Sequence, residues 1–364
     1  MSRSEAANKP EFPGRIAVIT MPPAINDDDF HSVDRLLERY GAEKIIHSAW
    51  PEDFMGEHDK MMATVAKLAQ DREVNTVIIS QAVPGTNAAI DKFKETRDDV
   101  FIIFASTRET AASAAARANL LLGPNEPGLA AAIVGQARKQ GAKVFVHYSF
   151  PRHMAQDLLR ERREIMHLEC LKEGVLFVDA MAMDPADRHG LASAQQFIVE
   201  NVPKLVAYYG HDTAFFATNC HLQVPLIKAV VNSRAIFPQP CCPSPFHGFP
   251  EALGIDTKGG FADLTYLIGE ACRIAAEKNM TDRLSTWPVS GSMLFTNAGA
   301  EYAIKWIKDE VSRNDFDDRI LAQCMNSVIA EAVGEECNVN LTSYSEGDKT
   351  YNNYKLVLMG YLDL

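Results

Sequence analysis

Two arginines stand where a chain of this kind would bind an anionic ligand. Arg108 follows the apolar run at residues 100–104, and Arg152 follows the run at residues 143–147. If both runs are parallel strands, their carboxyl ends lie at the sheet edge where open α/β proteins bind ligands. A guanidinium there could hold a carboxylate or a phosphate through paired N–H donors. The alternative for each is a surface arginine in an ion pair.

Aromatic and short polar side chains occur at the other predicted strand ends and in the loops between elements. Aromatic faces there could line a pocket or pack in the core, and short polar groups could orient a ligand or cap a helix. The predicted ligand-binding residues are Trp50, Ser80, Gln81, Ser106, Arg108, Tyr148, Phe150, Arg152, Asp179, Asp212, Asn219, Gln239 and Phe246.

Five histidines and three cysteines between residues 147 and 247 could suggest a metal site. They are His147, His153, His211, His221, His247, Cys220, Cys241 and Cys242. Their spacing is not that of a zinc finger or ribbon, and the sequence has no Cys-x-x-Cys pair. We therefore predict no metal site and no cofactor. The adjacent Cys241 and Cys242 are expected to stiffen or pack a loop, with oxidation or a soft metal as alternatives.

Sequence signatures of catalysis are missing. There is no Gly-x-Ser-x-Gly elbow, no phosphate-binding glycine loop and no dinucleotide fingerprint. His211 and Asp212 could do general acid–base chemistry, but neighbours on a strand point to opposite faces. The sequence therefore predicts binding rather than catalysis, with no catalytic residue assigned.

Strand-length apolar runs must position these residues, and they alternate with helical patterns. The first set lies at residues 15–20, 44–48, 76–79, 100–104 and 118–122, and a second set at 143–147, 174–178, 205–209, 214–217 and 235–237. This pattern predicts an α/β fold of two doubly wound, parallel-sheet lobes. We expect a flexible segment at 1–13, a first lobe at 14–140 plus about 245–290, and a second lobe at 141–244 plus about 291–364. Residues 338–352 are predicted to be a polar loop or an edge hairpin.

Length and composition fit a two-domain protein. The chain has 364 residues and a net charge of −12, so a nucleic-acid partner is not expected. No apolar run reaches the ~20 residues of a membrane span. The first 14 residues contain no signal-peptide core, which predicts a cytoplasmic protein, or an exported protein or lipoprotein if a signal has been removed. Seven cysteines, an odd number, favour a reducing compartment.

The duplicated pattern over residues 14–364, with the block 212–219 followed by a helix, resembles the type I periplasmic-binding-protein superfamily. That superfamily includes sugar-binding proteins, effector domains of lac-type repressors and basic-membrane-protein lipoproteins. The segments 149–154 and 243–248 are similar to a bacterial family of unassigned function, whose members are labelled transcriptional regulators or lipoproteins. The resemblance implies crossovers at 124–143, 238–254 and 283–296 and a ligand between lobes that close by a hinge motion. The tips around Arg108, Arg152 and Asn219 are then expected to share one hollow.

This chain differs from the superfamily pattern at two places, and each difference limits the function that the resemblance implies. Sugar-binding members carry Asn-Asp where this chain has Asn219-Cys220, which argues against a sugar. Only 14 residues precede Arg15, fewer than the ~50 of an N-terminal helix-turn-helix unit, so a self-contained transcription factor is not expected.

The function that the sequence favours is non-catalytic binding of a small polar ligand, carboxylate-bearing ones included, by a solute-binding or sensor-like protein. One alternative is an enzyme acting on a small metabolite through His211, Asp212 or Cys220. Another is a protein-interaction module that docks through the charged helix at 153–172. A homodimer, and a transporter or signalling partner, are compatible with the first function.

Overall fold

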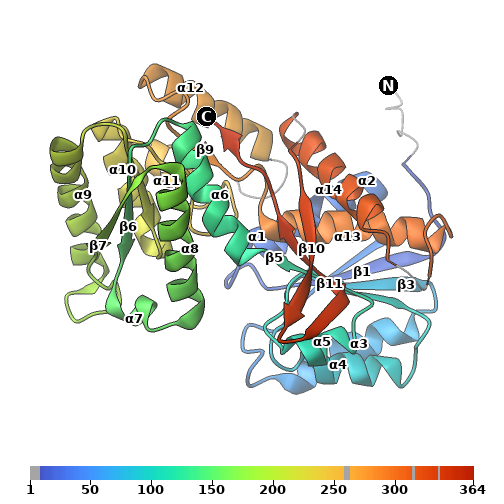
Figure 1. Cartoon of the computed structure of the whole chain (residues 1–364). Helices are drawn as coiled ribbons and strands as arrows, with labels where there is room; N and C mark the ends of the chain where they lie inside the picture. Colours follow the sequence, from blue (N-terminus) through green and yellow to red (C-terminus); the bar gives the residue numbers. More distant parts are fainter. Residues whose placement is uncertain (1–8, 258–262, 314–315, 335–336) are drawn as a thin grey trace, which may run out of the picture.

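The computed structural model describes residues 9–257, 263–313, 316–334 and 337–364, which form two lobes around two separate sheets (Figure 1). We call the part built on the seven-stranded sheet the first lobe and the part built on the three-stranded sheet the second lobe. Both sheets are mainly parallel with helices on both faces, as the sequence predicts.

The first sheet has the strand order β10-β11-β5-β4-β3-β1-β2. Its strands are β1 Arg15–Thr20, β2 Ile45–Ala49, β3 Val74–Ile79, β4 Phe101–Phe104, β5 Leu120–Pro124, β10 Asn340–Glu346 and β11 Lys349–Leu358. The neighbouring pairs from β2 to β11 are parallel, and β10 and β11 form an antiparallel hairpin at one edge. The region 338–352 thus takes the hairpin form of the two predicted alternatives.

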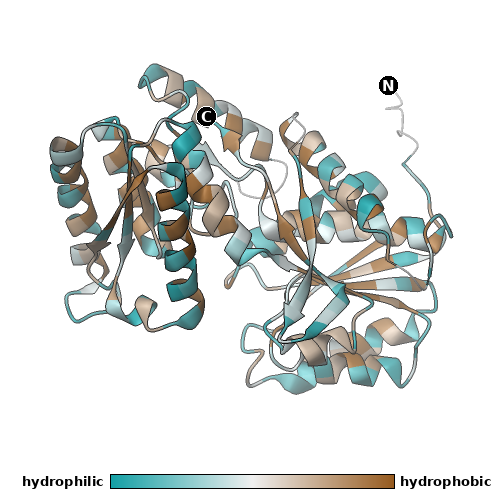
Figure 2. Ribbon diagram, in the orientation of Figure 1, coloured by the Kyte–Doolittle hydropathy of each residue, from teal (hydrophilic) through white to brown (hydrophobic). Residues whose placement is uncertain are grey.

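Helices cover both faces of the first sheet because its central strands are apolar on both sides. Ala17 and Ile19 face one core, and Ile16 and Val18 face the other, as the two-residue period of a strand requires. The first core is covered by α3 His58–Gln70, α4 Thr86–Lys94 and α5 Ala111–Ala115. The second is covered by α1 Asp27–Phe30, η1 His31–Val33, α2 Asp34–Tyr40, α13 Gly291–Ile307 and α14 Asp318–Val333. Figure 2 shows apolar residues along the strands and polar ones on outward helix faces.

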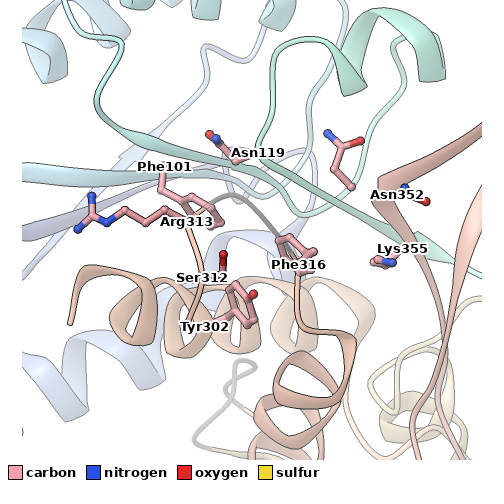
Figure 3. A pocket seen from close by; sticks show the side chains of 9 residues that line it. Phe101, Asn119, Tyr302, Ser312, Arg313, Phe316, Asn352 and Lys355 are labelled. Carbon is pink, nitrogen blue, oxygen red and sulfur yellow. The ribbon is translucent and has the colours of Figure 1, made fainter. Parts of the chain in front are cut away.

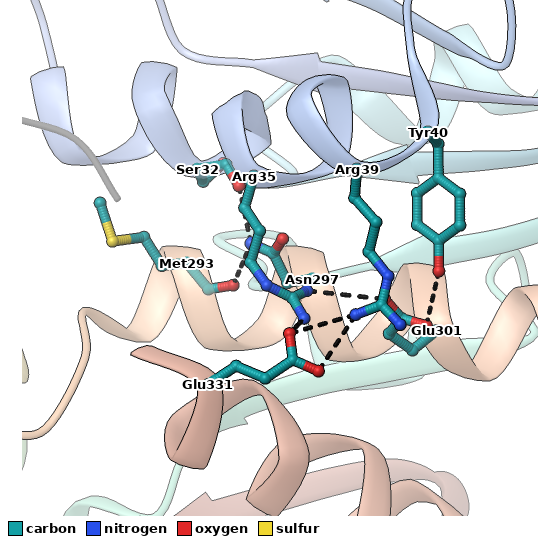
Figure 4. A network of polar contacts seen from close by, with 8 residues as sticks. All are labelled: Ser32, Arg35, Arg39, Tyr40, Met293, Asn297, Glu301 and Glu331. Atoms are coloured by element: carbon teal, nitrogen blue, oxygen red, sulfur yellow. Dashed lines mark hydrogen bonds and ion pairs between the residues drawn. The ribbon is translucent and has the colours of Figure 1, made fainter. Parts of the chain in front are cut away.

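A polar network ties α2 to the two late helices α13 and α14 (Figure 4). Glu331 accepts hydrogen bonds from Arg35 and from Arg39, the latter at 3.1 Å. Glu301 accepts from the hydroxyl of Tyr40 at 2.9 Å. Asn297 donates to the backbone carbonyls of Ser32 and Met293, both at 2.8 Å. These contacts hold the segment from 291 onward against the first lobe.

The second sheet has the order β7-β6-β8, with β6 Val144–Ser149, β7 Leu176–Met181 and β8 Thr213–Ala217 all parallel. Around it lie α6 Glu126–Lys139, α7 Pro151–Met154, α8 Asp157–Glu173, α9 Gly190–Tyr209, η2 Cys220–Leu222, α10 Gln223–Ser233 and α11 Phe249–Leu253, and α12 Leu264–Glu277 contacts both α11 and α14. The predicted strand at 235–237 makes isolated bridges to Ala214 and Leu284. A short pair of strands, β9 Ser285–Thr286 and β12 Leu362–Asp363, lies beside it.

The chain crosses between the lobes three times: through α6, between β9 and α13, and between β11 and β12. The predicted division assigned residues from about 291 onward to the second lobe and about 245–290 to the first. The structure differs, because β11 pairs with β5 and α13 packs on η1 and β3 of the first lobe. Apart from β12, the strands and helices after residue 290 therefore lie with the first lobe, while α11 lies on α10 of the second. The sequence shows that β11 is a strand, but its partner is chosen by long-range packing.

The predicted strand at 205–209 is wrong. These residues are the last turns of α9, in which Val206 is buried and Tyr208 is 80% exposed. A short apolar run does not distinguish a strand from a buried helix segment, and here it continues the helical period that begins at Gly190. The short apolar run at 293–295 is part of α13. None of the helices in the described ranges is both long enough and apolar enough to span a bilayer.

Candidate functional site

A cavity of about 300 Å³ lies where the first lobe meets a loop of the second. From the first lobe it is lined at the carboxyl ends of β3, β4 and β5, by α1 and the residue before it, and by the start of α13. From the second lobe it is lined by the proline-rich loop after β8. The lining residues are Asn26, Asp28, Ser80, Ala105, Ser106, Pro124, Cys242, Pro243, Ser244, His247, Ser290, Gly291, Ser292 and Phe295.

The position of this cavity follows from the strand order. The chain leaves β1 toward β2 on one side, and β3 returns on the other side of β1. Loops that leave adjacent strands in opposite directions open a crevice at their carboxyl ends, which is where open α/β sheets bind ligands. Asp28 follows β1 and Ser80 follows β3, so both stand beside this crevice.

Two neighbouring aspartates of α1 set the electrostatics of the cavity. The carboxylate of Asp29, 0% exposed, accepts hydrogen bonds from the Met21 amide at 2.7 Å and from the Ser80 hydroxyl at 2.6 Å. Burial raises the pKa of Asp29, and these hydrogen bonds oppose the shift. Burial also raises the pKa of Asp28, whose carboxylate accepts from the Ser244 hydroxyl at 2.5 Å. This last contact joins the two lobes at the cavity wall.

Four predicted residues of the first lobe are brought together here, but only two of them line the cavity. Ser80 and Ser106 line it, and the Ser106 hydroxyl donates to the Ser80 carbonyl at 3.0 Å. Trp50 and Gln81 do not line the cavity. The indole of Trp50, 2% exposed, donates to the Gln81 carbonyl at 3.3 Å. Arg108 is exposed, reaches the Gln81 side chain at 3.5 Å and does not line the cavity.

The predicted residues at the tips of β6 and β7 surround a different hollow. Phe150 and Asp179 help to line about 330 Å³ beside α7. Arg152 pairs with Asp184 at 2.7 Å and does not line the cavity between the lobes. Tyr148 is buried and donates to the Asn201 side chain at 2.7 Å. None of Arg108, Arg152 and Asn219 lines the cavity between the lobes, so that cavity is not the hollow that they were expected to share.

Asp212 is at the opposite end of the second sheet from its predicted place. Because residues 205–209 belong to α9, Asp212 precedes β8 instead of following a strand. It pairs there with Lys143 at 2.9 Å and with Arg283 at 3.6 Å. These ion pairs give Asp212 a structural role, away from the carboxyl edge.

Three further predicted residues lie along the segment that follows β8. The Asn219 side chain caps η2 by accepting from the His221 amide at 2.9 Å. Gln239 is 0% exposed, and its side-chain amide has no hydrogen-bond partner among the described residues. Phe246 is half-buried against the core and lines a shallow hollow of about 380 Å³ with Asp28.

A larger hollow, of about 420 Å³, was not anticipated from the sequence (Figure 3). It lies at the amino ends of β4 and β5 and is lined by Phe101, Asn119, Tyr302, Ser312, Arg313, Phe316, Asn352, Asn353 and Lys355. Ligands of open α/β sheets bind at carboxyl ends, so this hollow is the weaker candidate. Among the cavity residues that the sequence missed are Asn26, Asp28, Ser244, Ser290 and Ser292, which lie in short loops and helix starts without a strand signal.

Comparisons with known proteins agree with this architecture. Residues 15–285 match the family described as "Protein of unknown function (DUF3798)". An "Uncharacterized protein" of Treponema pallidum (strain Nichols) is 32% identical over 164 residues, covering 45% of this chain and 76% of that protein. The crystal structure of a "Putative transcriptional regulator" from Clostridium difficile 630 superposes with a TM-score of 0.85 at 21% identity, covering 98% of this chain and 100% of that one.

A structure titled as a sugar ABC transporter from Actinomyces odontolyticus ATCC 17982 superposes with a TM-score of 0.50 at 8% identity, covering 82% and 84% of the two chains. At such identities these likenesses concern the fold, which is of the type I periplasmic-binding-protein kind.

Proposed function

This chain belongs to the DUF3798 family of proteins of unknown function, and on that premise we propose that it is a non-catalytic protein that binds a small polar ligand in the cavity between its lobes. The observation that carries the proposal is the cavity itself. It lies at the carboxyl ends of the strands of the first sheet, next to the point between β1 and β3 where the strand order reverses. The proline-rich loop of the second lobe forms its other wall. Sites of this fold class have that position.

The lining favours a ligand that offers hydrogen-bond donors. Serine hydroxyls and the Asp28 carboxyl face the cavity, and its described lining contains neither arginine nor lysine. A carboxylate-bearing ligand would meet the Asp28 carboxyl with no arginine or lysine in the described lining to offset the repulsion, which is unfavourable in a buried site. We therefore propose a ligand with hydroxyl or amine groups. The volume is at the lower end of the ~300–1,000 Å³ of small-molecule sites, so the ligand is small.

We further propose that the first lobe comprises residues 14–125 with 291–358 and the second comprises residues 126–290. Three connections, which are α6, the segment 287–290 and the segment 359–361 that leads to β12, then form the hinge. Ligand contacts from both walls, such as those of Ser106 and Ser244, would stabilise the closed arrangement relative to the open one.

Thermal denaturation of the full chain against three ligand classes tests the proposal: neutral polyols, amines and organic acids. A ligand that binds only the folded chain adds about 2.7 kcal/mol of stability at 100 times its dissociation constant. Polyols or amines are expected to raise the melting temperature, and organic acids are not. If none of the three ligand classes raises the melting temperature, the proposal that the cavity binds a small polar ligand is refuted.

A pair of neighbouring substitutions locates the site. Ser106→Leu places a larger side chain in the cavity and should weaken binding at least tenfold. Thr107→Val is the matched control, because Thr107 is a half-buried neighbour that does not line the cavity. If Ser106→Leu binds the ligand as well as Thr107→Val does, the ligand is held elsewhere.

A further inference from the structure

Three cysteines and one histidine converge at the edge of the cavity between the lobes, and two of them, Cys242 and His247, belong to its lining. Cys220 begins η2, directly after the carboxyl end of β8. Cys241, Cys242 and His247 come from the proline-rich loop that precedes α11. One ligand atom from each of the four residues lies within 4.8 Å of the other three.

The distances in this cluster match the edges of a coordination tetrahedron. The Cys220 sulfur lies 3.8 Å from that of Cys241 and 3.5 Å from that of Cys242, and the last two are 3.8 Å apart. The Cys241 sulfur is 3.9 Å from Nε2 of His247. A Zn–S bond of ~2.3 Å in a regular tetrahedron gives S···S edges of about 3.8 Å. A disulfide would require about 2.05 Å, and all three cysteines are free.

We propose that Cys220, Cys241, Cys242 and His247 form a structural zinc site. Thiolate and imidazole ligands suit Zn²⁺, whereas Mg²⁺ and Ca²⁺ prefer oxygen ligands. Four protein ligands fill the tetrahedron and leave no open position, which is the arrangement of structural rather than catalytic zinc.

A buried cation lies near the cluster. The guanidinium of Arg162 interacts electrostatically with Cys242. Arg162 is itself buried, with its guanidinium 5.4 Å from the centre of the Phe216 ring. Arg162 also pairs with Glu126 at 3.6 Å, and its charge near Cys242 would partly offset the net negative charge that a Cys₃His zinc centre carries.

The position of the site indicates what the metal would do. Cys242 and His247 line the cavity, and Ser244 between them donates to Asp28 of the first lobe. Zinc would bind this loop to the end of β8 through Cys220. The metal would thereby fix the wall that the second lobe contributes to the cavity.

Metal analysis of the reduced, full-length chain tests this inference. After dialysis against limiting Zn²⁺, elemental analysis should find one zinc per chain. Co²⁺ in its place should give the absorption of tetrahedral cobalt with thiolate-to-metal charge-transfer bands. Cys220→Ser should weaken Zn²⁺ binding at least about 100-fold, because losing even an outer-shell partner costs ~10–100-fold. Cys272→Ser, a half-buried cysteine of α12, is the matched control and should retain one equivalent.

A second measurement needs no variant and so is independent of folding defects. With Zn²⁺ present, Cys220, Cys241 and Cys242 should be protected from iodoacetamide in the native chain, and Cys272 should react equally with and without the metal. If the three thiols are alkylated at the same rate in both conditions, or if Cys220→Ser binds as much zinc as the parent, the site does not exist. Both results are independent of whether the cavity binds a ligand.

Discussion

Replacing Glu331 by glutamine should destabilise the first lobe by about 1.5–2 kcal/mol. Glu331 lies on α14 and holds the two arginines of α2, Arg35 and Arg39. The Arg35 side chain is only 9% exposed, whereas that of Glu331 is 47% exposed. Removing one partner of a buried ion pair costs ~3–5 kcal/mol, and an exposed pair contributes ~0–1 kcal/mol, so a half-exposed partner of a buried guanidinium lies between them. Glu301 remains 3.5 Å from both arginines and limits the loss.

Urea and thermal denaturation followed by near-ultraviolet circular dichroism measure this change. At ~2–4 °C per kcal/mol for a unit of about 200 residues, the melting temperature of the first lobe should fall by about 3–8 °C. Glu310→Gln is the matched control, because Glu310 pairs with Lys305 at 3.4 Å with both side chains 41–49% exposed. Its cost should stay below about 0.5 kcal/mol.

A double-mutant cycle with Arg35→Gln isolates the pair from the other contacts of Arg35. A coupling energy of about 1–2 kcal/mol is expected, as for contacting residues in one network. If Glu331→Gln costs no more than Glu310→Gln and the coupling is zero, then the network does not fasten α14 to the first lobe. The attachment would then rest on apolar packing alone.

Three further outcomes follow from single contacts. Tyr148→Phe should cost about 0.5–1.5 kcal/mol of stability, since it removes a 2.7 Å hydrogen bond to the half-buried Asn201 side chain; chemical denaturation measures this. The Arg152 guanidinium lowers the pKa of Asp184 to about 2, so the ion pair is intact above pH ~4 and is lost as the pH falls toward the folded-state pKa. A titration of the Asp184 carboxyl by NMR should show this midpoint, and Arg152→Ala should return it to the ordinary range. Burial raises the pKa of Cys170 to about 12, so iodoacetamide at pH 8 should modify it only in urea; an equal rate in the native chain would contradict its burial.

The sequence by itself determined the local elements and their repetition. The runs that became β1, β3, β4 and β6 were readable because each is a nearly unbroken apolar segment between turn residues. Ser80 and Ser106 could be predicted at the cavity from the same rule, since each follows such a strand directly. The short run at 205–209 could not be read correctly, because its apolar content suits both the end of α9 and a strand.

Only the tertiary structure decided which distant segments meet. β11 pairs with β5 more than 220 positions earlier in the chain, which moved the last part of the sequence to the first lobe. Arg108 and Arg152 both follow strands as predicted, yet they belong to different sheets whose edges face different hollows. Cys220 reaches Cys241 and Cys242 across twenty intervening residues because η2 and the proline-rich loop fold back on each other. Hydrophobic periodicity and turn residues reflect interactions over a few positions of the chain. Contacts between lobes and loops depend on how whole helices and strands pack, and a local sequence pattern does not predict that packing.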